Sequence, residues 1–346
     1  MTHPSVLIIS TGGTISMVKD RETGALRPAA FEEFKTFMPE LGRNDISISM
    51  SPLTPSIDSS DVNPDLWLQL AQTIYDNYNL YDGFVILHGT DTMAYSASAL
   101  SFMLENLNKP VVFTGSQLPI GVLRTDAREN LQTAIEIAAA HDEDGEPIVP
   151  EVTIFFEDRL FRGNRTTKKN AEHFAAFKSY NYPHLAQSGV HIHYFPHLIL
   201  YRNKHAQLRL RTRIDTNIAI LKLFPGISHQ VVNAILNIPG LRAVVLETYG
   251  SGNAPSADWL MQDLGDAVRR GIIIVSKTQC IAGSVEMGRY QTSLNLLHAG
   301  VLSGYDITTE ALVTKLMYLL GESGDNPELI KELLSRPLCG EMTIDS

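Results

Sequence analysis

Hydroxyl, carboxylate and ammonium side chains follow short apolar runs in this sequence, in a combination that could support acyl transfer. Thr14 stands in "STGGTIS", Thr90 and Asp91 stand in "HGTDT", and Lys168 ends the stretch "GNRTTK". A threonine hydroxyl becomes a good nucleophile only when a base activates it, and a partly buried lysine can be that base. A neighbouring carboxylate would orient the lysine, while N–H groups of the glycines could stabilise an oxyanion. These residue types predict attack on an amide or ester through a threonyl intermediate.

Each of these residues also has a structural interpretation when it is taken alone. Gly12 and Gly13 could form a tight turn that binds phosphate, although the sequence matches neither G-x-G-x-x-G nor G-x-x-x-x-G-K-[ST]. Asp91 could cap a helix that begins near Thr92. Lys168 and the lysine after it could form a solvated pair. Only the conjunction of two threonines, an aspartate and a lysine favours catalysis.

Alternating strand and helix patterns explain how these residues could be brought together. Apolar runs predict strands at residues 5–9, 83–87, 110–114 and 151–156. Helical patterns cover 63–78, 92–107 and 126–140, and the last begins with Asp-x-x-Glu, which is typical of a capping box. The alternation predicts a mainly parallel sheet with helices on both faces, and ligands bind beyond the carboxyl ends of such strands. Ser116 and Gln117 also follow a predicted strand, where they could line the site or simply pack.

A second alternating series predicts a second domain. Its strands are expected at 217–223, 242–247 and 271–277, with helices at 256–270 and 308–320. Prolines, histidines and basic residues interrupt the pattern between the two series. We therefore expect an N-terminal catalytic α/β domain over 1–190, an extended linker over 191–213, and a smaller C-terminal α/β domain over 214–346.

Composition and charge exclude several classes of function. The chain has 346 residues, enough for about two domains of roughly 150 residues each. Its formal charge of −10 repels phosphate backbones, so no nucleic-acid partner is expected. No apolar stretch approaches the ~20 residues that span a bilayer, no secretory signal opens the sequence, and the two cysteines suit a reducing compartment. His191 and His193 have a spacing that a metal could use, but nothing completes a ligand set, so no metal is expected. These features predict a soluble, cytoplasmic protein without membrane contact.

Two separated motifs resemble a known family. "TGGTI" at 11–15 and "HGTDTM" at 88–93 are similar to the two signature motifs of the bacterial-type L-asparaginases. The stretch "DGFVILHGTDTMAYSASALSFMLENL" and the later "YGSGNAP" at 249–255 resemble the type I, cytoplasmic branch. The resemblance implies two α/β domains, a homodimer or a dimer of dimers, and hydrolysis of L-asparagine to L-aspartate and ammonia without a cofactor. A related amidase acting on glutamine or a larger amide stays open, as does a non-catalytic protein that binds a small metabolite.

The resemblance also implies roles for individual residues. Thr14 matches the first catalytic threonine, the expected nucleophile, and Thr90 with Asp91 and Lys168 matches the group that polarises the nucleophile or water. Asn253 matches an asparagine that reaches toward the site of a neighbouring subunit. The substrate's α-carboxylate and α-amino groups are expected on the "IDSSD" stretch, at Asp58, Ser59 and Ser60.

The loop after the first motif departs from the family pattern. Some members carry a tyrosine there that forms part of a lid over the first threonine. Residues 17–28 contain no tyrosine, and Ala25 or Leu26 occupies the matching position. Another group must then orient Thr14, and we expect this charged, glycine-containing loop to be mobile.

A second departure concerns regulation. Some type I members bind asparagine at an additional site that activates them allosterically. Thr167 and Cys280 match residues of that effector site, but Glu247 stands where an arginine would bind the effector carboxylate. Because an acid repels a carboxylate, the sequence predicts weak or absent cooperativity.

Overall fold

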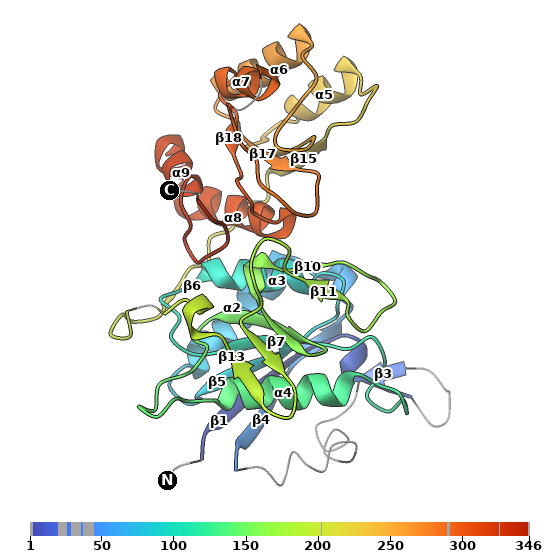
Figure 1. The fold of residues 1–346 in the computed structure, drawn as a ribbon, viewed down its shortest axis with the longest axis vertical. Helices are drawn as coiled ribbons and strands as arrows, with labels where there is room; N and C mark the ends of the chain where they lie inside the picture. Colours follow the sequence, from blue (N-terminus) through green and yellow to red (C-terminus); the bar gives the residue numbers. More distant parts are fainter. Residues whose placement is uncertain are drawn as a thin grey trace. The chain divides into compact units, whose positions relative to one another are not determined.

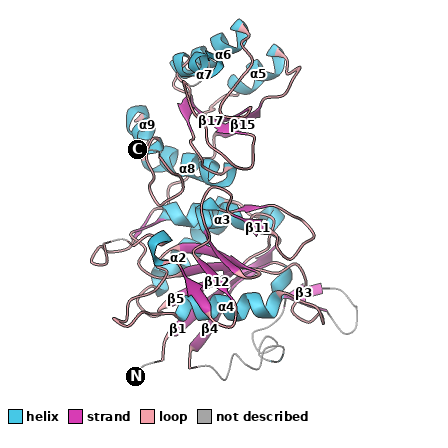
Figure 2. Ribbon diagram, viewed as in Figure 1, coloured by secondary structure: helices cyan, strands magenta, loops and turns pink. Residues whose placement is uncertain are grey.

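The computed structural model describes residues 3–19, 26–28, 36, 45–201, 203–288, 291–324 and 326–344. The chain divides into two compact units, Met1–Arg211 and Thr212–Ser346, which are drawn from blue to yellow-green and from yellow to red in Figure 1. Each unit contains a sheet with helices beside it (Figure 2). The predicted fold class, two α/β domains with the larger and mainly parallel sheet in the first, is confirmed. Among the described helices, none is long and apolar enough to cross a membrane.

The first unit is built on an eight-stranded sheet with the order β13-β12-β9-β8-β7-β5-β1-β4. Five neighbouring strands are parallel, and three antiparallel strands extend the sheet beyond β8. The predicted apolar runs supply four of the parallel strands. The parallel strands are β4 (Ser47–Ile57), β1 (Ser5–Gly12), β5 (Gly83–Leu87), β7 (Val111–Thr114) and β8 (Val152–Phe156). The antiparallel strands are β9 (Arg159–Arg162), β12 (Ala186–Ser188) and β13 (Ile192–Tyr194).

Helices cover both faces of this sheet because its central strands are apolar on both sides. Figure 1 shows α4 (Ala127–Ala139) on one side and α2 (Pro64–Asn77) and α3 (Met93–Met103) on the other. The predicted Asn-Pro start of α2 is present, with Asn63 accepting from the backbone N–H groups of Asp65 and Leu66. Alternate residues of the strands pack against α4, as the two-residue period of a strand requires. That layer contains Val6, Ile8, Val85, Leu87 and Val112 from the strands and Leu131, Ala134 and Ala138 from the helix.

The predicted capping box at the start of α4 is wrong. Asp126 is the N-cap residue, but its side chain accepts no capping hydrogen bond from the backbone N–H groups of the helix. Its carboxylate instead accepts from the backbone N–H groups of Gln117, at 3.0 Å, and Leu118, at 3.2 Å. The turn after β7 offers unpaired N–H groups to the same carboxylate, so a tertiary contact replaces the local one.

The segment from 191 to 213, expected as an extended linker, contains two strands. Strand β13 pairs with β12 at the edge of the large sheet. Strand β14 (Arg209–Leu210) pairs with β6 (Leu104–Glu105), which directly follows α3. Most of the segment therefore packs as part of the first unit, while the exact domain limits stay predictions. Two further short pairs complete this unit, β2 (Met17–Lys19) with β3 (Leu26–Pro28) and β10 (Thr167–Lys168) with β11 (Phe177–Lys178).

The second unit contains a four-stranded parallel sheet with the order β15-β16-β17-β18. Its core lies where Val244, Leu246 and Ile274 of the strands meet Val232, Leu260 and Leu264 of two helices. The strands are β15 (Ile218–Lys222), β16 (Ala243–Thr248), β17 (Ile273–Thr278) and β18 (Leu302–Ser303). The helices are α5 (His229–Leu236), α6 (Asp258–Arg269), α7 (Gln291–His298), α8 (Thr309–Glu322) and α9 (Pro327–Leu334).

A buried ion pair joins α8 to the segment that follows α9. Both Lys315 and Glu341 are fully buried, with Lys315 Nζ 2.7 Å from Glu341 Oε1. Lys315 also donates to the carbonyl of Arg336 at 2.8 Å, and Glu341 accepts from the N–H groups of Leu338 and Cys339. Two buried charges are tolerated only when they are paired and hydrogen-bonded in this way.

Candidate active site

The polar residues singled out in the sequence follow strands that lie side by side in the large sheet. Ser10 of β1 is level with Leu87 of β5, and Leu87 is level with Thr114 of β7. The three strands therefore end at one edge. Thr14 begins a short 3-10 helix, Thr14–Ser16, directly after β1, and the Thr90–Asp91 stretch follows β5. This edge is the place where open parallel sheets bind ligands.

Two glycines allow these segments to approach one another closely. Gly13 has φ 75°, and a Cβ placed on it would lie 2.5 Å from the backbone N of Gly89. A Cβ on Gly89 would lie 2.5 Å from Ser59 Oγ. Neither approach leaves room for a side chain, so only glycine fits. The loops that carry Thr14, Ser59 and Thr90 are consequently packed directly against one another.

Lys168 meets Thr90 and Asp91 at this edge. Its Nζ lies 2.8 Å from Thr90 Oγ1 and 2.6 Å from Asp91 Oδ1. The Lys168 side chain is 17 % exposed and that of Asp91 is 65 % exposed, so the ammonium is largely enclosed and the carboxylate faces outward. Lys168 is therefore not part of a solvated pair. Asp91 does not cap α3 either, because the N-cap residue is Thr92.

The "IDSSD" stretch forms a turn beside the second motif. Asp58 caps the 3-10 helix Ser59–Asp61 and accepts from the backbone N of Ser60 at 2.9 Å and from its hydroxyl at 2.8 Å. These two bonds lower the pKa of Asp58, the backbone bond most. The carbonyl of Ser59 accepts from the Thr92 hydroxyl at 2.7 Å. The turn is thereby attached to the loop that carries Thr90.

His88 is a buried residue of this site to which the sequence analysis assigned no role. Its Nδ1 lies 2.7 Å from the carbonyl of Gly89, which can only accept, so Nδ1 carries a proton. Its Nε2 lies 2.9 Å from Ser96 Oγ, and Ser96 accepts from the indole N–H of Trp67 at 3.0 Å. Burial lowers the pKa of His88 to about 4, so the ring is neutral and Ser96 donates to Nε2.

This chain of hydrogen bonds runs from α2 through α3 to the peptide before Thr90. Its only sequence signal is a histidine directly after the fully buried run "GFVIL", where a polar side chain must find partners. The sequence gives no means of naming those partners, because Trp67 and Ser96 come from two different helices.

Two of the residues singled out in the second unit lie at or just after the end of β16. Asn253 exchanges backbone hydrogen bonds with Tyr249, both at 2.8 Å, in the turn that follows the strand. Glu247 is buried near the end of β16, where its carboxylate lies 3.3 Å from Lys222 Nζ and accepts from the Thr309 hydroxyl at 3.2 Å. The role of Asn253 toward another subunit stays a prediction.

Three features singled out in the sequence remain: Thr167, Cys280 and the lid loop. Thr167 lies on β10 in the first unit, next to Lys168, and Cys280 is exposed in the second unit after β17. Residues 17–19 and 26–28 pair as β2 and β3. Ala25 and the rest of 20–25 lie outside the described residues, so the expected mobility of the loop stays a prediction.

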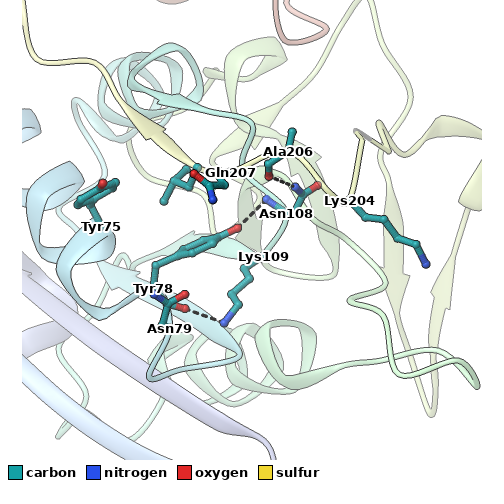
Figure 3. Close-up of a pocket in the computed structure, with 9 residues that line it drawn as sticks. Tyr75, Tyr78, Asn79, Asn108, Lys109, Lys204, Ala206 and Gln207 are labelled. Carbon is teal, nitrogen blue, oxygen red and sulfur yellow. Dashed lines mark hydrogen bonds between the residues drawn. The ribbon is translucent and has the colours of Figure 1, made fainter.

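Within the described ranges, no group of three or more His, Cys, Asp or Glu side chains could hold a metal ion. Figure 3 shows a separate hollow of about 530 Å³. Its lining residues Asn79 and Lys109 precede β5 and β7, so it lies near the amino ends of these strands, whereas Thr90 follows the carboxyl end of β5. Both of its lysines have partners: Lys109 donates to the carbonyls of Tyr78 and Tyr81, and Lys204, which extends away from the tyrosines, binds Glu146. Because it lies at the opposite ends of the strands, the hollow is separate from the candidate active site.

Comparisons with known proteins cover both units. Residues 5–200 match the family model "Asparaginase, N-terminal", and residues 217–334 match "Glutaminase/Asparaginase C-terminal domain". The chain is 43 % identical over 351 residues to L-asparaginase 1 of Escherichia coli strain K12, covering 100 % of both chains. It is 42 % identical to the human 60 kDa lysophospholipase over 98 % of this chain and 58 % of that protein. The crystal structure of L-asparaginase I from Vibrio cholerae superimposes with a TM-score of 0.89 at 42 % identity, covering 99 % of each chain.

Proposed function

This chain belongs to the asparaginase family, and we propose that it hydrolyses L-asparagine to L-aspartate and ammonia. The observation that carries the proposal is the contact of Lys168 Nζ with Thr90 Oγ1, at 2.8 Å, beside the carboxylate of Asp91. Acyl transfer by a threonine needs a base within hydrogen-bond reach of a hydroxyl. A protein that only binds a metabolite has no need for this arrangement.

Two half-reactions account for the chemistry. In the first, Thr14 Oγ1 bonds to the amide carbon, the C–N bond breaks, and the threonine proton leaves with the nitrogen as ammonia. In the second, water adds its oxygen to the acyl carbon and returns a proton to Thr14, which releases aspartate. Lys168, acting through the Thr90 hydroxyl, polarises Thr14 or the attacking water.

Substrate recognition is assigned to the turn beside the second motif and to Asp91. The Asp91 carboxylate is 65 % exposed, which leaves it accessible to the α-amino group of the substrate while it holds Lys168. Ser59 and Ser60 offer hydroxyl groups to the α-carboxylate, and Asp58 fixes Ser60 through two hydrogen bonds. Glutamine is longer than asparagine by one methylene, which a simple pocket distinguishes by about 1–3 kcal/mol. Because this difference is small, we assign asparagine rather than glutamine as the substrate from the family match.

The test is ammonia release from the purified chain over a wide range of L-asparagine, with L-glutamine in parallel. Thr90→Val keeps the shape of the side chain and removes the hydroxyl that Lys168 contacts, so activity should fall by about 10²- to 10⁴-fold. Thr73→Val is the matched control, because Thr73 is half-buried on α2 and its hydroxyl donates to the Gln69 carbonyl at 2.7 Å. A strong preference for glutamine would mean that glutamine, and not asparagine, is the substrate. No ammonia from either amide would favour the metabolite-binding alternative.

We also propose a cytoplasmic enzyme that assembles as a homodimer or a dimer of dimers. Both cysteines are free, which suits a reducing compartment. The second unit exposes large apolar side chains, Ile220 and Phe224 among them, that a second copy could cover. Asn253 would then contribute to the site of the neighbouring copy. Sedimentation analysis of the purified chain tests the assembly.

Cooperativity is proposed to be weak or absent. The carboxylate of Glu247 is engaged by Lys222 and Thr309, at the position where an arginine would be needed to bind an effector carboxylate. A second asparagine would meet a negative charge there. The asparagine saturation curve should be hyperbolic, and a clearly sigmoidal curve would contradict this proposal.

A further inference from the structure

Ser10 is a buried serine in a row of core positions. It follows Val6 and Ile8 at the two-residue period of β1, on the face that packs against α4, where an apolar side chain would be expected. Only 6 % of the residue is exposed. Because a buried hydroxyl costs free energy unless it is hydrogen-bonded, the partner of Ser10 should explain why a serine stands here.

The partner of Ser10 is Ser16, the last residue of the short 3-10 helix Thr14–Ser16. Their Oγ atoms lie 2.9 Å apart, and either hydroxyl can donate. Ser16 is also buried. The bond joins the end of β1 to the end of the 3-10 helix and therefore closes a loop around the five residues "TGGTI" at 11–15. We call the two side chains the serine pair.

The enclosed loop contains two consecutive glycines, which make a link across it effective. Gly12 has φ 118° and Gly13 has φ 75°, conformations that residues with a side chain rarely adopt. Glycine also has more backbone freedom to lose on folding than any other residue. A hydrogen bond between the residues that flank the loop restricts this freedom.

Other contacts hold the same loop at separate points. The Thr11 hydroxyl donates to the carbonyl of Leu87 at 3.0 Å, which attaches the loop to β5. Ile15 is fully buried in the core that includes α4. Every residue from 10 to 16 is buried except Thr14, which is half-buried. The loop is therefore fixed around Thr14, whose side chain stays partly exposed at the edge of the sheet that carries the candidate active site.

We propose that Ser10 and Ser16 form a positioning pair that sets the direction in which Thr14 presents its hydroxyl. The close approach of Gly13 to Gly89 sets the distance to the neighbouring loop, but a single point of approach leaves the 3-10 helix free to turn about it. The serine pair removes that freedom. Both serines act through Thr14 rather than on the substrate. This inference rests on the proposed amidohydrolase function and adds two residues to which the sequence analysis assigned no role.

A pair that only stabilises the fold is the alternative, and a double variant separates the two roles. Removing one hydroxyl leaves the other buried without its partner, whereas removing both replaces two polar groups by apolar ones of nearly the same shape. The melting temperature should therefore fall in each single variant and recover in the double variant. If the pair positions Thr14, activity will not recover with it, because the link across the loop is still missing.

The experiment compares Ser10→Ala, Ser16→Ala and the double variant with the parent chain. Ser98→Ala is the matched control, because Ser98 is a buried serine of α3 whose hydroxyl has no hydrogen-bond partner within the part of the chain that the structure describes. Each protein is assayed for kcat and KM with L-asparagine. Thermal melting gives the melting temperature of each protein and verifies that it folds.

We expect each single variant to lower the melting temperature by about 2–4 °C, and the double variant to return to within about 1 °C of the parent. In all three, kcat should fall by about tenfold, because the direction of the nucleophile is lost. KM should stay within about threefold, because the turn at 58–60 and Asp91 keep hydrogen bonds of their own.

A double variant with the kcat of the parent would overturn the inference and leave a structural pair, as would an equal loss of kcat in Ser98→Ala. If the double variant does not fold, the single variants decide, and a fall in kcat of less than about threefold in both would overturn the inference. Absence of ammonia from the parent and from Ser98→Ala would refute the proposed function and this inference with it.

Discussion

Acidification should destabilise the first unit through His88, and the size of the effect follows from its buried position. The ring is neutral in the folded chain, where burial lowers its pKa from 6.5 to about 4. In the unfolded chain the same ring binds a proton below about pH 6.5. Between these values the unfolded state holds more protons, so the free energy of unfolding falls as the pH falls. The stabilising contribution of the neutral His88 ring is therefore complete above pH 6.5 and fully lost below pH 4.

The magnitude can be worked out from the shift. Each pKa unit corresponds to about 1.4 kcal/mol, so a shift of this size is worth at most about 3 kcal/mol. At pH 5, between the two values, about 2 kcal/mol of it should already be lost relative to pH 7. A loss of that size is a large part of the stability of a typical domain.

The matched perturbation is His88→Gln, whose amide does not titrate but offers a donor and an acceptor. Trp67 is buried and donates to Ser96, the partner of His88, so its fluorescence reports on this region. The chain contains one other tryptophan, Trp259, and a Trp259→Phe background isolates the signal. Urea unfolding at pH 7 and pH 5 then gives the free energy of unfolding for each protein.

The parent should lose about 2 kcal/mol more than His88→Gln between the two pH values. Other titrating groups are shared by both proteins, so the difference between them isolates His88. Equal pH dependence in the two proteins would refute the reasoning, because it would mean that the ring is either protonated in the folded chain or exposed to solvent.

Three further outcomes are expected. Lys168→Met should lower kcat for asparagine by about 10²- to 10⁴-fold, because the Thr90 hydroxyl loses its base, and steady-state kinetics measure the loss. Gly89→Ala should lower both melting temperature and activity, because its Cβ would lie 2.5 Å from Ser59 Oγ; adding Ser59→Gly should restore part of the melting temperature, and no recovery would locate the strain elsewhere. Lys315→Met should cost about 3–5 kcal/mol by leaving the Glu341 carboxylate buried without its partner. Chemical denaturation measures that cost, and the double variant with Glu341→Gln should be the more stable of the two.

The central strands could be predicted from the sequence because they are buried on both faces and read as continuous apolar runs. The run at 83–87 coincides with β5 to the residue. Strand β4 was missed, although it is the longest of the sheet at 11 residues. It has no fully buried residue and contains Pro52 and Pro55, which a sheet tolerates at an edge. Its first half does alternate apolar and polar residues, since "ISISMS" at 46–51 places Ile46, Ile48 and Met50 against the core. The sequence analysis looked for continuous apolar runs and did not use this signal.

The site was predictable to the extent that strand order determines it. Thr90 and Asp91 were identified from residue types at the end of a parallel strand, and parallel strands bring such ends together. Lys168 follows the antiparallel strand β9, so strand order alone does not account for its contact with Thr90. The supporting contacts were not predictable, since they depend on which helix packs where. Asp126 shows this most clearly: its sequence context favours a local cap, yet its carboxylate binds the turn that carries Gln117. His88 depends in the same way on α2 and α3.

The backbone contact between Gly13 and Gly89 has a consequence for redesigning substrate preference. Because the Thr14 and Thr90 loops meet through main-chain atoms, their spacing does not depend on the size of any side chain. Substitutions in the sheet core can therefore weaken or strengthen the fold while the two hydroxyl-bearing loops keep their separation. A library of variants intended to admit a longer amide would gain little from substitutions in the sheet core. Its diversity belongs in the turn at 58–60, where the carboxylate of Asp58 and the hydroxyl of Ser60 make the contacts.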